Sequence, residues 1–204
     1  MKNLKKSNKM NSRETIIKRI KRNSPEIKPL SGSFPGTEPF SNEQLLVEFK
    51  ANLVKAGGEI LESGNSNELD NYLENHFPGA IDLTRKTDRE KYSFASKQEL
   101  EKVQTVIVPG QLGVAENGAV WIDETNLPDR LLPFVTEQLV IVLNEGNMVR
   151  DMVEAYHRIN LEDVGFGVFI SGPSKTADIE QSLVYGAHGA KKLVIIMHWK
   201  DTGR

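Results

Sequence analysis

SGPSKTADIEQSLVYGAHG, at residues 171–189, is the stretch that decides the predicted fold. One apolar run, at residues 168–170, comes before it, and a second, at residues 193–197, follows it. The Gly-Pro pair favours a tight loop after the first run, and residues from about 177 to 185 are expected to form a helix. This order of strand, loop, helix and strand predicts a parallel sheet. The loop would lie at the carboxyl end of a strand, where ligands of such sheets bind.

The rest of the chain extends this alternation of helices and strands. Capping boxes at Ser41 and Ser96 and apolar stripes at helical spacing predict helices. The expected helices are 12–22, 41–56, 67–75, a turn after 96, 131–136 and 147–159. The expected strands are 59–61, 80–83, 103–108 (ended by Pro109 and Gly110), 139–143, 168–170 and 193–198. Together they predict an α/β fold, a largely parallel sheet flanked by helices on both faces.

Charge and composition divide the 204 residues into two parts. The first 22 residues carry nine Lys or Arg against Glu14, a net charge of +8, so the remainder carries −10 of the overall −2. Residues 24–40 are rich in Pro and Gly, as linkers are. We therefore expect a basic arm and linker at 1–40 and a domain at 41–204. A basic arm can bind nucleic acid or an acidic membrane surface, or it can be a solvated helix that contacts an acidic partner or a second copy of the chain. The contact with a partner is favoured, because the arm lacks the aromatic residues and motifs typical of nucleic-acid binding.

Several classes of protein are excluded or disfavoured by what the sequence lacks. There is no cysteine, which excludes disulfides, thiolate chemistry and cysteine-ligated iron–sulfur clusters within these residues. No apolar run approaches the ~20 residues that cross a bilayer, and no secretory signal is recognisable, so a cytoplasmic location is expected. Neither of the standard glycine-rich nucleotide motifs occurs.

The loop at residues 171–176 is the first candidate site. Its N–H groups and the start of the predicted helix could hold the phosphate or carboxylate of a small anionic molecule, with Lys175 adding positive charge. Alternatively, Ser174 or Thr176 simply caps the helix, whose first turn already contains two acidic residues that favour the helix dipole and would repel an anion.

Ala115-Glu116-Asn117-Gly118 is the second candidate site. A glutamate beside a glycine turn at the end of a strand could act as a nucleophile or a general base. Asn-Gly between two apolar runs is also the strongest short-range hairpin signal, and spacing alone favours that interpretation. Glu116 would then be only the residue before the turn.

Histidines form the third candidate group. His188 lies at the edge opposite the loop, which favours a role in ending a helix or contacting a subunit. His198 ends its strand on the edge expected to bind ligand. The four histidines show no pair at metal-ligand spacing, so no metal site is expected.

Two of these motifs carry a resemblance to a known family. SGPSKTADIE at 171–180 and LVYGAHG at 183–189 resemble the signature of the lactate utilisation (LUD) domain family, protein C type, with Lys175 where arginine is commoner. The residues at 115–118 are similar to the family's Ala-Glu-Thr-Gly, with asparagine in the threonine place. The resemblance extends over about 43–199.

This resemblance implies a fold similar to the NagB/RpiA/CoA-transferase-like superfamily. It also implies an accessory, non-redox role in the oxidation of L-lactate to pyruvate, beside iron–sulfur partner proteins that hold the clusters. One alternative is an enzyme that acts on an acyl-CoA or sugar phosphate through Glu116, because CoA transferases carry their glutamate in a similar Glu-Asn-Gly context. A second alternative is a protein that serves only in assembly. The implied pocket has Glu116 as catalytic residue and ligand contacts from Asn117, Gly118, Ser171, Gly172, Ser174, Lys175, Thr176 and His198.

Overall fold

A computed structural model of the chain describes residues 12–23, 40–65, 68–84, 92, 97–161, 164–177, 183–185 and 189–199. Internal contacts divide the chain into two units, Met1–Glu38 and Pro39–Arg204. Within the first, α1 (Ser12–Asn23) is a helix as predicted, and it exposes Ile16, Ile17 and Ile20. The predicted linker lies outside the described residues apart from Phe40. None of the described helices has the length and apolar character that a membrane crossing requires.

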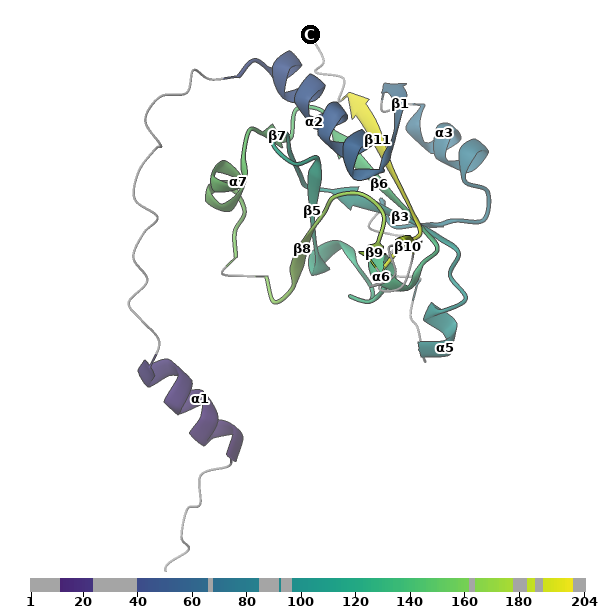
Figure 1. The fold of residues 1–204 in the computed structure, drawn as a ribbon. Helices are drawn as coiled ribbons and strands as arrows, with labels where there is room; N and C mark the ends of the chain where they lie inside the picture. The colour runs from purple at the N-terminus through teal and green to yellow at the C-terminus, as the bar shows by residue number, and fades with distance from the viewer. Residues whose placement is uncertain are drawn as a thin grey trace, which may run out of the picture. The chain divides into compact units, whose positions relative to one another are not determined.

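A five-stranded parallel sheet forms the centre of the second unit (Figure 1). Its order is β1 (Glu59–Asn65), β11 (Lys192–Trp199), β6 (Gln138–Asn144), β3 (Thr105–Gly110) and β2 (Ile81–Asp82), and every neighbouring pair is parallel. The α/β prediction is therefore confirmed. The strand predicted at 139–143 is part of β6, in the middle of the sheet, and its residues from Leu139 to Leu143 are buried.

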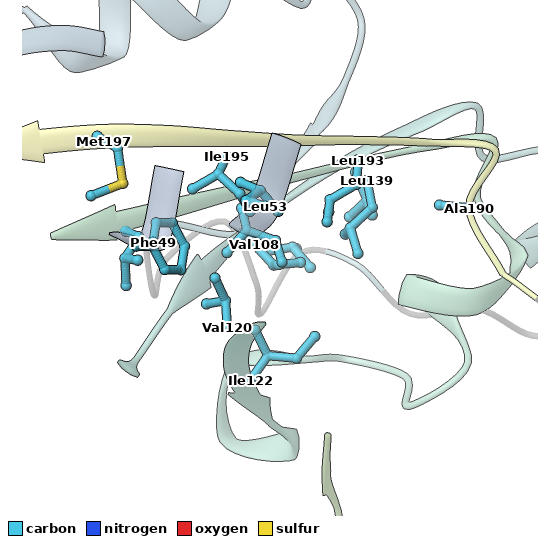
Figure 2. Packing of buried hydrophobic residues seen from close by; sticks show 14 of the residues in the cluster. Phe49, Leu53, Val108, Val120, Ile122, Leu139, Ala190, Leu193, Ile195 and Met197 are labelled. Atoms are coloured by element: carbon cyan, nitrogen blue, oxygen red, sulfur yellow. The ribbon is translucent and has the colours of Figure 1, made fainter. Parts of the chain in front are cut away.

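Helices cover both faces of this sheet, as predicted. Ser41 caps α2 (Asn42–Ala56) with a complete capping box, and Gly57 ends the helix in the left-handed conformation. α2 packs on one face through Phe49 and Leu53, whose side chains meet those of β11 and β3 in Figure 2. α3 (Leu69–His76) packs on the other face through Leu73.

A second sheet, not predicted as a separate unit, covers the same face as α2. Its order is β7 (Met148–Val149), β4 (Leu112–Val114), β5 (Ala119–Asp123) and β8 (Gly167–Ile170), and β8 pairs antiparallel with β5. Val120 and Ile122 of β5 point into the main core (Figure 2). The shorter helical elements are α5 (Lys97–Leu100), η1 (Glu124–Asn126), α6 (Leu132–Val135) and α7 (Met152–Arg158).

The helix predicted at 177–185 is wrong. β9 (Lys175–Ala177) and β10 (Leu183–Tyr185) flank residues outside the described part and pair antiparallel with each other. Val184 and Tyr185 are residue types that favour strands, and this pairing overrides the local helical pattern.

Two further boundaries differ from the prediction. Met148 belongs to β7 and is buried in the main core, so the helix predicted at 147–159 begins only at Met152, after the N-cap Asp151. Pro109 and Gly110 continue β3 instead of ending it. β2 pairs with β3 only as far as Ile107, so Pro109, which has no N–H to donate, lies where one side of the strand has no partner.

Candidate functional site

Residues 115–118 form the turn of a β4–β5 hairpin, so the hairpin interpretation of this motif is confirmed. Gly118 has φ +64° and donates its N–H to the Val114 carbonyl. The Asn117 side-chain oxygen accepts a hydrogen bond from the Ala119 N–H at 3.0 Å. Asparagine and glycine in this motif therefore act as turn residues.

The hairpin turn lies against the C-terminal half of α2. The Asn52 amide donates to the backbone carbonyls of Ala115 and Glu116, at 2.8 and 3.1 Å. A Cβ atom on Gly118 would come within 2.4 Å of the Leu53 backbone nitrogen. Only glycine allows the turn to approach the helix this closely.

The Ser171–Lys175 part of the first motif contacts the end of the same helix. A Cβ on Gly172, at φ +77°, would lie 2.5 Å from the Ala56 carbonyl oxygen. Lys175 donates from Nζ to that oxygen at 2.6 Å, and the Ser171 hydroxyl donates to the Asn117 carbonyl at 2.7 Å. The two motifs thus meet each other and enclose the C-terminal end of α2. The hydrogen bond places the Lys175 ammonium at the negative end of the helix dipole, where a cation is favourable.

Glu116 faces another element. Its side chain is exposed, and Oε2 accepts the Met152 N–H at 3.0 Å, at the N-terminus of α7. A carboxylate at this position stabilises the start of a helix. Glu116 and the Ser171–Lys175 loop are joined through the backbone of the turn, at Asn117, and not through the carboxylate.

A cavity of about 250 Å³ lies beside Ser171, Gly172 and Ser174. Its other walls are mainly apolar, from β6, α6, β8 and β11, and Glu116 is not among its lining residues. Among the described residues that line it there is no Lys, Arg or His. The described lining therefore offers an anion no positively charged side chain. The side chain of Thr176, in β9, lies outside what the structure describes.

His198 lies at the other edge of the parallel sheet from this loop. The Ser174 N–H donates to the Ala190 carbonyl, just before the amino end of β11, whereas His198 is near the carboxyl end of that strand. Eight residues of extended chain span roughly 26 Å. The prediction that the loop lies at the carboxyl edge of the parallel sheet is wrong, because β8 does not join that sheet but pairs antiparallel with β5 in the second sheet. His188 lies outside the described residues.

A different group of polar side chains gathers at the carboxyl edge. Asn144 and His198 are register partners on β6 and β11, so their side chains share one face of the sheet, and Ser63 is near the carboxyl end of the adjacent β1. Within the part of the chain that the structure describes, the Ser63 hydroxyl, the Asn144 amide nitrogen and Glu145 Oε1 are buried without a hydrogen-bond partner. Buried polar groups are nearly always hydrogen-bonded, so each of these atoms indicates a position that a solvent molecule or a ligand completes.

Charged residues adjoin this edge from α2 and β1. Lys50 of α2 forms an ion pair with Glu62 of β1. Burial raises the pKa of Glu145; Lys50 opposes this shift and Glu62 adds to it. A carboxyl group with a raised pKa can take up or release a proton closer to neutral pH than an ordinary glutamate. We call Lys50, Glu62, Ser63, Asn144, Glu145 and His198 the carboxyl-edge cluster. It extends over both faces of the sheet, because Glu62 shares the α2 face with Met197, whereas Asn144 and His198 point to the opposite face.

The position of the carboxyl-edge cluster is where open α/β sheets bind ligands. After β1 the chain continues into α3, on one face of the parallel sheet, and after β6 it continues into the second sheet, on the opposite face. The two connections therefore leave the sheet in opposite directions on either side of β11, and ligands bind where connections separate in this way. Of this cluster, sequence reasoning identified only His198. In the sequence, the rest of the cluster is indicated only by two polar residues, Asn144 and Glu145, that directly follow a buried strand. Among the described residues, no group of His, Asp and Glu is arranged to hold a metal ion.

Comparisons with known proteins agree with this fold. The family model described as LUD domain matches residues 12–197. The chain is 28% identical over 113 residues to lactate utilization protein C of Bacillus pumilus, covering 50% of this chain and 47% of that protein. It is 27% identical over 175 residues to the protein of the same name from Geobacillus sp. (strain WCH70), covering 76% and 70%.

Two other matches carry no functional name. An uncharacterised protein of Neisseria meningitidis is 36% identical over 89 residues, 42% of this chain and 38% of that protein. The chain thus spans less than half the length of the first relatives it matches. A crystal structure of a DUF162 family protein from Deinococcus radiodurans superposes with a TM-score of 0.58 at 16% identity, covering 78% of this chain and 99% of that one. This likeness shows the fold.

Proposed function

The chain belongs to the LUD domain family, and on that premise we propose that it is an accessory, non-redox component of L-lactate oxidation to pyruvate. The observation that carries the proposal is the family match over residues 12–197, together with relatives named lactate utilization protein C, which supports a role in lactate utilisation. In this role the chain acts with iron–sulfur proteins of the same system, and we place it in the cytoplasm.

The non-redox part of the proposal rests on the side chains available. Oxidation of lactate removes two electrons, which need an acceptor. Iron–sulfur clusters are held mainly by cysteine thiolates, and the 204 residues contain no cysteine and no glycine-rich dinucleotide motif. We therefore assign electron transfer to the partner proteins and ligand binding or assembly to this chain.

An enzyme acting on an acyl-CoA or sugar phosphate through Glu116 is less well supported. That chemistry needs the carboxylate to face a substrate cavity. Glu116 instead accepts the Met152 N–H at the start of α7, and Lys175 of the neighbouring motif is bound to the end of α2. Both motifs are explained by packing around α2 and α7. If this chain has a ligand of its own, we place it at the carboxyl-edge cluster, where, among the described residues, the polar atoms of Ser63, Asn144 and Glu145 named above are buried without a hydrogen-bond partner.

The proposal is tested by isolating the chain with its partners from cells of the source organism grown on L-lactate. We expect a tagged chain to co-purify with iron–sulfur proteins, and the assembly to reduce a dye in the presence of L-lactate. The purified chain alone should show no such activity. Lactate-dependent dye reduction by the pure, flavin-free chain, or normal growth on lactate after deletion of its gene, would contradict the accessory role.

A further inference from the structure

A cavity of about 380 Å³ lies on the outer face of the second sheet, between β4, β5 and the C-terminal end of α7. Its floor includes Leu112 and Trp121, each only 6% exposed, with Ile159 beside them. These residues belong to the separate hydrophobic cluster between the second sheet and α7, not to the main core. The cavity is therefore distinct from both places described above.

The floor of this cavity is preformed. The Trp121 indole packs against the Phe169 ring, with ring centroids 4.8 Å apart. Phe169 in turn packs edge-on against the Tyr156 ring. A Cβ atom on Gly167 would lie 2.2 Å from the indole ring, so the ring rests directly on the backbone of β8. A rigid aromatic surface of this kind loses little entropy when an apolar ligand covers it.

A guanidinium group lines the cavity above that floor. Arg158, in the last turn of α7, donates from Nη1 to the Met148 carbonyl at 3.2 Å. This hydrogen bond uses one of five N–H donors and restrains the planar group, which leaves other donors for a ligand. Guanidinium remains charged at all physiological pH values and binds a carboxylate through two parallel hydrogen bonds. The Asn147 side chain adds an amide to the same lining.

One carboxylate limits the charge that the cavity accepts. Asp123 lines it and is 6% exposed, and its Oδ1 accepts hydrogen bonds from the Thr125 N–H, at 2.9 Å, and from the Thr125 hydroxyl. Arg158 and Asp123 are the two charged side chains among the described residues that line the cavity, and their charges balance, so this described lining suits a ligand with one negative charge better than a phosphate dianion. A volume of about 380 Å³ also lies in the range of pockets for small organic molecules and exceeds what lactate alone fills.

We propose that this cavity is a binding site for an organic monocarboxylate with an apolar, preferably aromatic, body. The carboxylate lies on Arg158 and the apolar body covers Leu112 and Trp121. The proposal does not depend on the proposed function, since it rests only on the lining of this cavity.

The test uses the full chain and four probes measured by calorimetry: 3-phenyllactate, its neutral amide, phenyl phosphate and L-lactate. We expect 3-phenyllactate to bind and to shift the methyl NMR signals of Leu112 and Ile159. The other three probes should each bind at least about tenfold more weakly. The neutral amide lacks the negative charge, phenyl phosphate carries two negative charges, and L-lactate lacks the aromatic ring that would cover Leu112 and Trp121. Equal binding of the amide, or no binding of 3-phenyllactate at millimolar concentration, would overturn the proposal.

Variants then locate the site. Arg158→Gln should weaken 3-phenyllactate at least about tenfold, and Arg158→Lys should recover only part of the loss because an ammonium lacks the planar fork. Lys191→Gln, which removes one positive charge beside the amino end of β11 and outside the lining of this cavity, should change binding less than twofold, about 0.4 kcal/mol. Arg158 is exposed, and thermal unfolding will show that its variants fold. Unchanged binding by folded Arg158→Gln would also exclude the proposed site.

Discussion

The ammonium group of Lys175 donates a 2.6 Å hydrogen bond to the carbonyl oxygen of Ala56, the last residue of α2. These residues are 119 positions apart in the chain. Carbonyl groups at the end of a helix lack intrahelical partners and carry partial negative charge, so a cation there is favourable. The residue of the first motif that was expected to attract an anionic ligand thus lies at the end of α2, where its charge is expected to stabilise the helix.

Lys175→Met should lower the free energy of unfolding by about 0.3–1 kcal/mol, the usual value of a cation at a helix C-terminus. Lys175→Arg should retain most of the stability. Lys191→Met is the matched control, because Lys191 forms only an exposed ion pair with Glu137, and such pairs contribute little. Urea denaturation of the three variants measures the difference. If Lys175→Met equals the control, Lys175 does not stabilise α2 in solution.

Gly172→Ala should destabilise the domain more than Gly79→Ala. Both glycines have φ +77°, so each alanine meets the same backbone strain, about 1–2 kcal/mol. A Cβ at Gly79 meets nothing within 4 Å, whereas at Gly172 it lies 2.5 Å from the Ala56 carbonyl. The difference between the two variants in urea denaturation therefore isolates the close approach of the loop to α2. Equal losses would show that the loop moves away without cost.

Glu116→Gln should leave stability within about 0.5 kcal/mol of the parent, since glutamine keeps an oxygen that can accept the Met152 N–H. Glu116→Ala removes this acceptor from the start of α7 and should cost about 0.5–2 kcal/mol, the range seen when capping oxygens are lost. Both variants should support lactate-dependent dye reduction by the assembled complex. A folded Glu116→Gln variant without that activity would restore the catalytic interpretation of this residue.

Glu145→Gln should stabilise the protein in a pH-dependent way. Burial raises the pKa of Glu145 in the folded state, so the folded state binds more protons than the unfolded chain. The free energy of unfolding of the parent therefore falls as the pH rises from about 4.3, the ordinary value for glutamate, through the raised pKa. Glutamine is neutral throughout, so the stability gained by the variant should be smallest below about pH 4 and larger at pH 7.

Thermal unfolding across this pH range measures the effect of Glu145→Gln. Glu74→Gln, on the exposed side of α3, is the control for removing one negative charge. A gain at pH 7 no larger than the gain at pH 4 would show that burial does not govern the ionisation of Glu145.

Local patterns predicted the elements that depend on local interactions. The capping box at Ser41 and the glycine after α2 were identified because their hydrogen bonds join residues a few positions apart. The hairpin follows from the preference of Asn117 and Gly118 for turns, although the loop that joins its strands has four residues, 115–118, and not two. The apolar run of β6 indicated a strand buried on both faces. These features follow from the sequence alone.

The sheet edge at which each motif lies was decided only by the tertiary structure. The sequence pattern of β8 is that of another parallel strand, but Ile170 pairs antiparallel with Val120 in the second sheet, which takes the Ser171–Lys175 loop to the amino edge of the parallel sheet. Asn144 and His198 become neighbours through strand register across 54 positions. Apolar alternation indicates that a segment is a strand, but it does not select the partner strand. That choice depends on burying the whole set of apolar faces at once, which no local pattern records.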